Sequence, residues 1–422
     1  MTMSLLWGDE QISYRLDDCG AAAVLCESSA LSRIGTFIGH VIDIDDPAIS
    51  SAPTEFVDAD TAADDPALIF YTSGTTGLAK GVVHAHRTLI GHNEFTECHD
   101  LHAGDVFFGA GEWAFSLAKL FGPLRLGAIQ VVYRSAAGLD PAGLLAVLSE
   151  HRVNTALLNP SWLRKVRLDA PDAGRRWPMS FRVVCSSNEP LTVIDWFEEQ
   201  FAVEIFDYYG STESYPLLGN RPTVPVKRGS VGRPLPGWEV RLLDDNGNDV
   251  ADGECGEICL RANSNPQYPL GYWNRPEATA ETFGGPWYRT KDQATRDADG
   301  YFWVLGRSDD VIKTSGYRVG PYEVEAVLRE HPGVRDAGVV GVPDGIRGQR
   351  IEAYVELRDG LVGDEQLERE LIDHVKTRYS RFAYPRRVIF TERLPRSATS
   401  KVQRAELRRI GLESSSTAHS IS

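Results

Sequence analysis

The 422-residue sequence contains no apolar run that approaches the roughly 18 residues needed to span a membrane. It also lacks an excess of basic residues, because 44 Lys and Arg stand against 59 Asp and Glu, a formal net charge of −15. General nucleic-acid binding depends on Lys and Arg neutralising phosphates, so this balance argues against it. The first residues show no basic segment followed by a cleavage site, and we expect a cytoplasmic protein.

Cysteine is scarce and scattered, with six in the whole chain. Cys255 and Cys259 are separated by three residues, but no second Cys/His pair follows at zinc spacing. We therefore expect reduced, buried thiols and no zinc site. The apolar share of 42% and the charged share of 24% are typical of a globular protein, and the length predicts two or three domains.

The most informative stretch lies at residues 67–81, where a short apolar run predicts a buried strand and a polar loop follows. Glycines let this loop turn tightly and approach a ligand, while hydroxyls and backbone N–H groups form an anion-binding concavity. The candidate phosphate-binding residues are Thr72, Ser73, Gly74, Thr75, Thr76, Gly77 and Lys80. Lys80 follows Gly77 by three residues, so the loop is not a Walker loop. The alternative is a polar hairpin turn without a ligand.

Strand and helix patterns alternate along residues 128–208, which predicts a largely parallel sheet covered by helices. A helix is also predicted over residues 87–96. Residues 229–306 instead contain short strand patterns between Pro-Gly, Asn-Gly and Asp-Gly turns, so we expect a mostly β subdomain there. The predicted class is α/β, with a large domain over residues 1–306 and a small α+β domain over residues 307–412. Polar residues 413–422 predict a disordered tail.

A second cluster, Asp-Tyr-Tyr-Gly-Ser-Thr-Glu, follows a predicted strand directly and covers residues 207–213. Parallel sheets bind ligands at the carboxyl ends of their strands. A carboxylate beside a polyphosphate can hold Mg²⁺, which keeps few protein ligands and several waters. Taken alone, the cluster could equally be a solvated loop.

These two clusters, together with runs at residues 287–292, 306–318 and 394–404, resemble the signatures of the adenylate-forming superfamily. That superfamily includes acyl-CoA synthetases, peptide-synthetase adenylation domains and luciferases. The resemblance implies a large domain of parallel sheets with a β subdomain, followed by a small mobile C-terminal domain. It also implies ATP and Mg²⁺, with CoA as the co-substrate.

Several residue roles follow from the resemblance alone. Thr212 would contact the phosphates and Glu213 would bind magnesium, with Asp207 and Tyr209 bordering the adenine. Glu189 lies in Asn-Glu-Pro, which matches the family's Gly-Glu-Pro adenine turn except that Asn188 replaces glycine.

The remaining nucleotide residues come from the later signatures. Asp292 would accept the ribose hydroxyls, and Arg307 would reach the ribose or α-phosphate, with Arg318 in the same signature. Asp309 would be the hinge between the domains. Lys291 occupies a place that the family usually gives to glycine, so the local turn is expected to differ.

The lysine near the C-terminus carries the catalytic prediction. Lys401 lies in a run that resembles the family's Pro-Arg-Thr-x-x-Gly-Lys-x-x-Arg loop, with Ser400 where glycine is common. In the family this lysine contacts the carboxylate and the α-phosphate, and such a cation stabilises charge that develops during transfer. We expect Lys401 to be the main catalytic residue.

The implied reaction is ATP-dependent formation of an acyl-adenylate, followed by transfer of the acyl group to CoA. Residues 271–279 resemble the corresponding run in acetyl- and medium-chain acyl-CoA synthetases. Acetate-specific members carry a tryptophan where this chain has Gly210, so we predict an acyl group larger than acetyl. Trp113, Phe115 and Trp162 are candidates for lining the acyl pocket, although core packing is an equal alternative for each.

The beginning of the chain departs from the family, whose members usually carry about 100 more residues before the part that matches residues 12–26. Such a difference is expected to expose sheet edge and core surface. Two alternatives therefore stay open besides a CoA ligase. One is an inactive or partner-dependent form, completed by a homo-oligomer or another chain. The other is a ligase that loads the phosphopantetheine of a carrier protein.

Overall fold

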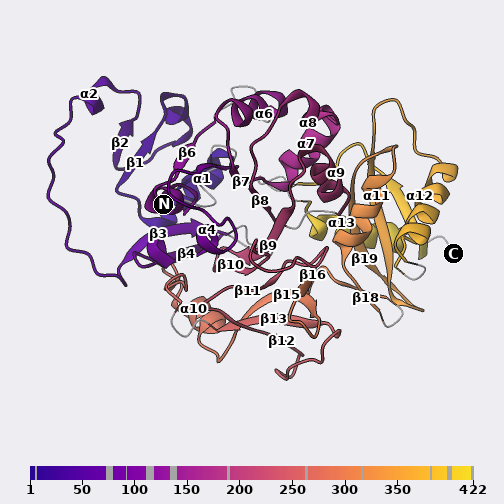
Figure 1. Cartoon of the computed structure of the whole chain (residues 1–422). Helices are drawn as coiled ribbons and strands as arrows, with labels where there is room; N and C mark the ends of the chain where they lie inside the picture. The colour runs from indigo at the N-terminus through magenta and orange to yellow at the C-terminus, as the bar shows by residue number, and fades with distance from the viewer. Residues whose placement is uncertain are drawn as a thin grey trace.

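The computed structural model describes residues 1–4, 7–72, 79–91, 93–110, 118–133, 140–187, 191–261, 265–314, 317–380, 383–396 and 402–419. The α/β class predicted from the sequence is confirmed. Sheets and helices of residues 66–307 form the body, and the N-terminal and C-terminal segments lie at opposite ends of it (Figure 1).

A seven-stranded sheet forms the centre of the body, in the order β11-β10-β9-β8-β7-β5-β6. The strands from β6 to β9 are parallel, as expected, whereas β10 and β11 are antiparallel additions at the edge. The strands are β5 (Val106–Gly109), β6 (Ile129–Val131), β7 (Thr155–Leu157), β8 (Val183–Ser186), β9 (Ile205–Ser211), β10 (Ser214–Gly219) and β11 (Arg233–Pro234).

Helices cover one face of this sheet, and capping residues begin two of them. Asp140 accepts a bond from the backbone of Gly143 and starts α6 (Pro141–Glu150), and Asn159 does the same for α7 (Pro160–Asp169). A proline follows each cap, where its missing N–H costs nothing. The other helices of this region are α5 (Ala118–Arg125), α8 (Ala173–Arg176) and α9 (Leu191–Phe201).

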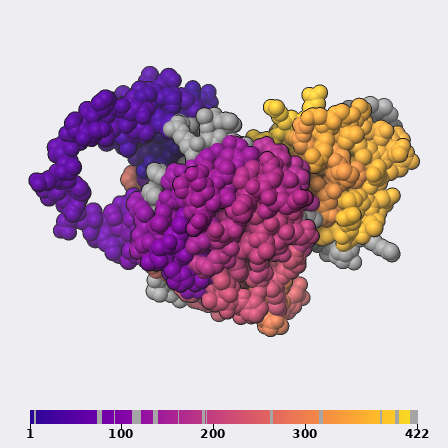
Figure 2. All heavy atoms as spheres, turned by 45° about the horizontal axis from the view of Figure 1, so that its top comes forward, coloured from indigo at the N-terminus to yellow at the C-terminus, as the bar shows by residue number. Residues whose placement is uncertain are grey.

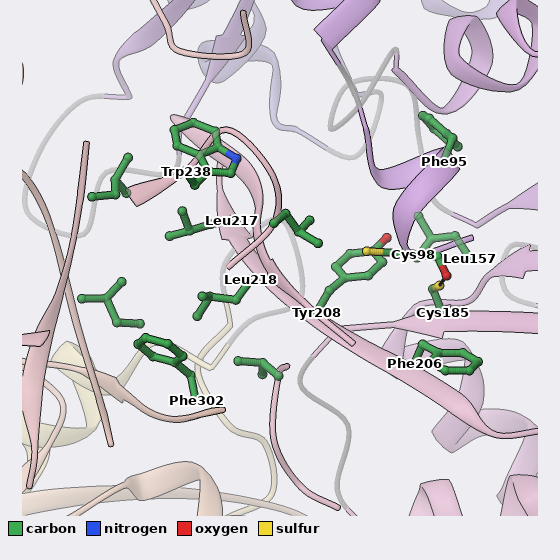
Figure 3. Close-up of a cluster of buried hydrophobic side chains, with 14 of the residues drawn as sticks. Phe95, Cys98, Leu157, Cys185, Phe206, Tyr208, Leu217, Leu218, Trp238 and Phe302 are labelled. Atoms are coloured by element: carbon green, nitrogen blue, oxygen red, sulfur yellow. Dashed lines mark hydrogen bonds between the residues drawn. The ribbon is translucent and has the colours of Figure 1, made fainter. Parts of the chain in front are cut away.

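Alternating residues of the parallel strands feed two separate cores. Ala156 and Val184 point to the helices α6, α7 and α9, where Trp162 is fully enclosed. Leu157 and Cys185 point to the other face, toward Phe95 and the β region. Figure 3 shows this second core running from Phe95 through Tyr208 to Phe302. Trp162 is thus a core residue in this fold.

The predicted β subdomain is built mainly from a four-stranded antiparallel sheet in the order β12-β13-β15-β16. Its strands are β12 (Glu239–Leu243), β13 (Gly256–Arg261), β15 (Tyr288–Arg296) and β16 (Phe302–Arg307). A three-stranded sheet, β14-β4-β3, adjoins it and consists of β3 (Pro66–Tyr71), β4 (Gly81–Ala85) and β14 (Gly271–Tyr272). One helix, α10 (Pro276–Phe283), follows β14 in this region.

The N-terminal segment forms a small lobe whose chain arches away from the body (Figure 2). Its elements are α1 (Asp9–Cys19), β1 (Ala23–Cys26), the 3₁₀ helix η1 (Ser28–Arg33), β2 (His40–Asp43) and α2 (Pro47–Ser50). Strands β1 and β2 pair in parallel, and Leu25, Val41 and Ile42 are exposed on them. Phe56 and Val57 are 82% and 96% exposed in the connection to β3. Apolar side chains therefore face solvent on β1, on β2 and in the connection to β3.

The helix predicted over residues 87–96 is wrong in its extent. The structure has two short helices instead, α3 (Thr88–Gly91) and α4 (Glu94–Glu97). Tertiary contacts hold the segment: the hydroxyl of Thr88 donates to the carbonyl of Pro266, and the side chain of Asn93 donates to the carbonyl of Pro236.

The C-terminal region has its own five-stranded sheet and core. Its elements are β17 (Ile312–Thr314), β18 (Tyr317–Val319), α11 (Pro321–Glu330), β19 (Val334–Asp344), β20 (Gly348–Leu357), α12 (Glu365–Arg378), β21 (Arg387–Phe390) and α13 (Arg404–His419). Helix α13 continues to His419, and the disordered tail over residues 413–422 stays a prediction. Arg409 pairs with Glu406 and Glu413 one turn to each side, which supports the helix past residue 412. In the described part of the chain, no helix is long and apolar enough to cross a membrane.

Candidate active site

The base of the predicted phosphate loop lies between two paired strands. Tyr71 at the end of β3 pairs with Gly81 at the start of β4, and the N–H of Thr72 donates to the carbonyl of Lys80 over 2.9 Å. Thr72 and Lys80 therefore flank the loop. The predicted ligands between them, Ser73, Gly74, Thr75, Thr76 and Gly77, lie outside the described residues.

The acidic cluster forms the turn between β9 and β10. Ser211 and Ser214 pair across this turn, so Thr212 and Glu213 occupy its tip. The carbonyl of Thr212 accepts a bond of 3.0 Å from Nε2 of His84 on β4. Glu213 is largely buried. A hydrogen bond thus fastens the turn to β4, the strand that follows the phosphate loop.

Tyr272 connects the two clusters, a role that no sequence signal indicated beyond its place in the run at 271–279. Its hydroxyl donates to Oε1 of Glu213 over 3.0 Å, and its ring centroid lies 5.0 Å from Nζ of Lys80. Burial and the charge of Glu213 raise the pKa of the Tyr272 phenol, so it remains a hydrogen-bond donor. Tyr272, at the end of β14, therefore contacts both a cation, Lys80, and a carboxylate, Glu213.

Glu213 fits the role of a magnesium ligand through the chemistry of its surroundings. No three His, Cys, Asp or Glu side chains converge on a point anywhere in the described ranges, so those residues offer no all-protein cage for a metal. A single carboxylate beside a phosphate-binding loop is the donor set that Mg²⁺ uses, because it takes its remaining ligands from phosphate and water.

The residues predicted to hold adenine and ribose also come together. Asp207 is a buried member of β9, next to Ser186 of β8. The hydroxyl of Tyr209, two residues further, donates to the carboxylate of Asp292 on β15. Burial and the nearby Asp292 raise the pKa of Tyr209 well above its ordinary value. A carboxylate that accepts from one hydroxyl here has the chemistry to accept from ribose hydroxyls.

Arg307 stands opposite Asp292 in the β15–β16 pairing, and its Nε lies 3.1 Å from the carboxylate of Asp309. Burial alone would lower the pKa of Arg307, but the carboxylates of Asp292, Asp309 and Asp310 outweigh it and raise the pKa. Burial and the nearby charges of Glu213 and Asp292 raise the pKa of Tyr288, a buried residue on β15, so both carboxylates lie near this side chain.

The lysine in the family's glycine place keeps a glycine-like backbone. Lys291 has a φ of 65°, in the left-handed region. Its N–H donates to Glu257 over 2.9 Å, and its carbonyl accepts from the N–H of Ser308 over 2.7 Å. These bonds hold a left-handed conformation, which glycine adopts with less strain than lysine.

Gly210 is explained by close packing against β10. A Cβ at this position would lie 2.7 Å from the carbonyl oxygen of Ser214 and 2.9 Å from Cα of Tyr215. Both are backbone atoms, which cannot move aside as the end of a flexible side chain can. The glycine therefore permits the β9–β10 approach, and it does not by itself indicate an enlarged acyl pocket.

The remaining predicted residues lie outside what the structure describes. Lys401, Glu189, Trp113 and Phe115 are not among the described residues, and Arg318 is described only through the backbone of β18, where it pairs with Lys313.

A layer behind the phosphate loop was also missed by sequence reasoning. The hydroxyl of Tyr14 on α1 donates to the carbonyl of Ala79 over 2.8 Å, next to Lys80. Asp18, also on α1, accepts from Tyr71 over 2.7 Å and from Arg275 over 2.5 Å. Helix α1 thus supports the loop from behind, through contacts between segments far apart in the sequence.

Comparison with known proteins identifies the family of the chain. The family model for "AMP-binding enzyme" matches residues 1–273, and the model for its C-terminal domain matches residues 323–401. The uncharacterized acyl–CoA ligase YtcI of Bacillus subtilis is 36% identical over 373 residues, which cover 86% of this chain and 69% of the relative. The 4-hydroxybutyrate–CoA ligase 1 of Metallosphaera sedula is 34% identical, covering 94% and 73%.

Solved structures agree on the architecture. The anthranilate CoA ligase AuaEII, in complex with anthranoyl-AMP, superposes with a TM-score of 0.87 at 29% identity and covers 98% of this chain and 83% of its own. A benzoate CoA ligase from Burkholderia xenovorans gives a TM-score of 0.80 at 31% identity, with coverages of 96% and 83%. The chain belongs to the AMP-binding, adenylate-forming enzyme family and is an AMP-forming ligase of its acyl-CoA synthetase branch.

Proposed function

We propose that this enzyme activates a carboxylic acid with ATP and transfers the acyl group to CoA. The observation that carries the proposal is the convergence of Lys80, Tyr272 and Glu213 beside the Tyr209–Asp292 pair. This arrangement supplies a cation and a carboxylate for a polyphosphate, and a separate carboxylate for a ribose, within one site.

The first step joins two anions. A carboxylate oxygen of the acid attacks the α-phosphorus of ATP, the bond to the bridging oxygen breaks, and pyrophosphate leaves. Lys80 and Thr212 bind the phosphates, while Asp207, Tyr209, Asp292 and Arg307 orient the nucleoside. Magnesium on Glu213 would offset phosphate charge. Lys401 approaches the α-phosphate and stabilises the charge that develops there.

The second step transfers the acyl group. The small C-terminal region turns about Asp309 and brings the thiol to the mixed anhydride, as in other enzymes gated by domain motion. The thiolate sulfur attacks the acyl carbonyl, the carbonyl–phosphate bond breaks, and AMP leaves with both electrons of that bond. The products are an acyl-CoA and AMP.

We propose an acyl group larger than acetyl. The support comes from the names of relatives and structural neighbours, which act on 4-hydroxybutyrate, benzoate and anthranilate. A related acetyl-coenzyme A synthetase of Bacillus subtilis, 32% identical, is the competing indication. Free CoA is favoured over a carrier protein because the relatives are named as CoA ligases.

The test measures pyrophosphate release and AMP formation across acids from acetate to dodecanoate, with benzoate and anthranilate included, each with and without CoA. We expect one class of acid to turn over, with AMP release dependent on CoA and abolished in Lys401→Ala. Turnover that needs a phosphopantetheinylated carrier instead of CoA would overturn the choice of acceptor. Acetate as the best acid would overturn the acyl class.

A second candidate is favoured by the exposed apolar lobe at residues 23–57. Surface of this kind in a soluble enzyme is normally covered, so activity can depend on another polypeptide seated there. The same assay separates the two: a folded sample that binds ATP but turns over no acid, and that gains activity only on addition of a partner, supports the second candidate.

A further inference from the structure

A single turn between β16 and β17 joins the four-stranded sheet to the C-terminal sheet. The residues of this turn form hydrogen bonds to both of these regions. The N–H of Ser308 donates to the carbonyl of Lys291 on β15, over 2.7 Å. The carbonyl of Asp309 and the carboxylate of Asp310 contact helix α13 of the C-terminal region. On the other side, the carboxylate of Asp309 accepts from Arg307 of β16, and the N–H of Asp310 donates to the carbonyl of Arg307. Contacts to the two regions therefore meet at Asp309 and Asp310.

Arg408 makes the contacts on the C-terminal side. Its Nη1 donates to the backbone carbonyl of Asp309 over 2.9 Å and to the carboxylate of Asp310 over 2.8 Å. The same carboxylate lies 3.5 Å from Nη1 of Arg404, one turn earlier on α13. Two arginines of one helix thus hold two consecutive residues of the turn.

Arg404 is itself held in the core of the C-terminal region. Its guanidinium donates to both oxygens of Glu325 at 2.7 and 2.8 Å, and it lies 4.0 Å from the ring centroid of Tyr322. The side chains of Arg404 and Glu325 are only 6% and 1% exposed. Glu325 also accepts from the N–H of Val339 on β19. The contact to Asp310 therefore has a rigid base.

The same arginine ends the segment that carries Lys401. Arg396 and Val402 form a β-bridge, and the N–H of Gln403 donates to the carbonyl of Pro395 over 2.8 Å. These bonds close the base of the segment immediately before Arg404. The turn at Asp309 and the base of the lysine segment are consequently fastened to one cluster.

We propose that Arg408, supported by Arg404, is a positioning residue that fixes the turn to helix α13 and confines the pivot between the two regions to Asp309. The proposal rests on the two-step ligase function above. In this proposal, the C-terminal region and the segment that carries Lys401 rotate together as one body, because Arg408 and Arg404 hold Asp310 directly against α13. Loss of the Arg408 contacts would spread the rotation over several residues of the turn and would change the ratio of the rates of the two steps.

Arg408→Gln is the decisive variant, because it removes both contacts to the turn and leaves the Arg404–Glu325 pair intact. Arg409→Gln is its matched control, since Arg409 lies on the same helix and pairs with Glu406 and Glu413 only on that helix. Single-turnover adenylation and the transfer from supplied acyl-adenylate to CoA are measured separately in each variant. We expect the ratio of the two rates to change about threefold to fivefold in Arg408→Gln, the effect of one partly exposed ion pair, and to stay unchanged in Arg409→Gln.

A readout without turnover separates this proposal from the proposed function. Hydrogen exchange of the backbone amides at residues 308–314 is expected to rise about threefold to fivefold in Arg408→Gln, and not in Arg409→Gln. Arg408→Lys, which keeps one charge-assisted bond, is expected to recover part of both effects. Failure of every acid to turn over would reject the ligase function without touching the exchange result.

The proposal is overturned if Arg408→Gln leaves both the exchange at residues 308–314 and the rate ratio as in the parent enzyme. It is also overturned if the two rates fall in equal proportion together with the melting temperature, which is the signature of a merely structural role. Should Arg408→Gln fail to fold, Asp310→Asn removes the carboxylate side of the same contact and is judged by the same two measurements.

Discussion

His84 is expected to make the large domain sensitive to acid. This histidine lies on β4, is 7% exposed, and holds the carbonyl of Thr212 beside the proposed magnesium ligand. Burial lowers the pKa of His84 from its ordinary 6.5 to about 4, although the bond to Thr212 opposes part of that effect. In the unfolded chain the imidazole takes up a proton below pH 6.5, whereas the folded protein resists until about pH 4.

Stability is therefore lost as the pH falls through this window, and it is retained above it. Between pH 7 and pH 5 the two pKa values give a loss of about 2 kcal/mol in the free energy of unfolding. His84→Gln removes the titration but keeps an N–H that can donate to Thr212. We expect this variant to lose about 2 kcal/mol less than the parent protein over the same interval.

The assay is urea unfolding at pH 7 and pH 5, followed by tryptophan fluorescence, with histidine NMR titration of the folded protein. His151→Gln is the control, because His151 is exposed at the end of α6 and should leave the pH dependence unchanged. The reasoning is refuted if the His84 imidazole titrates near its ordinary pKa, or if the parent and His84→Gln show the same pH dependence.

Three further predictions concern single side chains. Lys291→Gly should raise stability by about 1 kcal/mol in thermal unfolding, since glycine adopts the left-handed φ without strain; an equal gain in Lys291→Ala would contradict this cause. Asp292→Asn should weaken binding of a fluorescent ATP analogue by about tenfold to a hundredfold through loss of a charged acceptor, whereas Asp252→Asn, which alters an exposed pair with Arg296, should not. Trp162→Ala should cost about 3 to 5 kcal/mol in urea unfolding by leaving a core cavity, and a changed preference among acids would instead assign Trp162 to the acyl pocket.

Local sequence patterns predicted the helices and strands that are determined by residues close together in the chain. The alternating strands and helices predicted over residues 128–208 are present, including the helix Leu191–Phe201, and a strand, Pro66–Tyr71, leads into the phosphate loop as predicted. Such elements follow from the periodicity of apolar residues and from glycine and proline at their ends. The sequence by itself also determined the family, because five stretches that resemble its signatures follow one another in order along the chain.

Contacts between distant segments decided the rest. The Tyr272–Glu213 bond and the His84–Thr212 bond join residues 59 and 128 positions apart, and no local pattern encodes either of them. Tertiary packing also assigned Gly210 to the approach of β10 and split the helix predicted over residues 87–96. The sequence determined which chemical groups the protein carries. Only the folded chain decided which of them meet, because the free energy that brings them together comes from burying surface that is dispersed along the sequence.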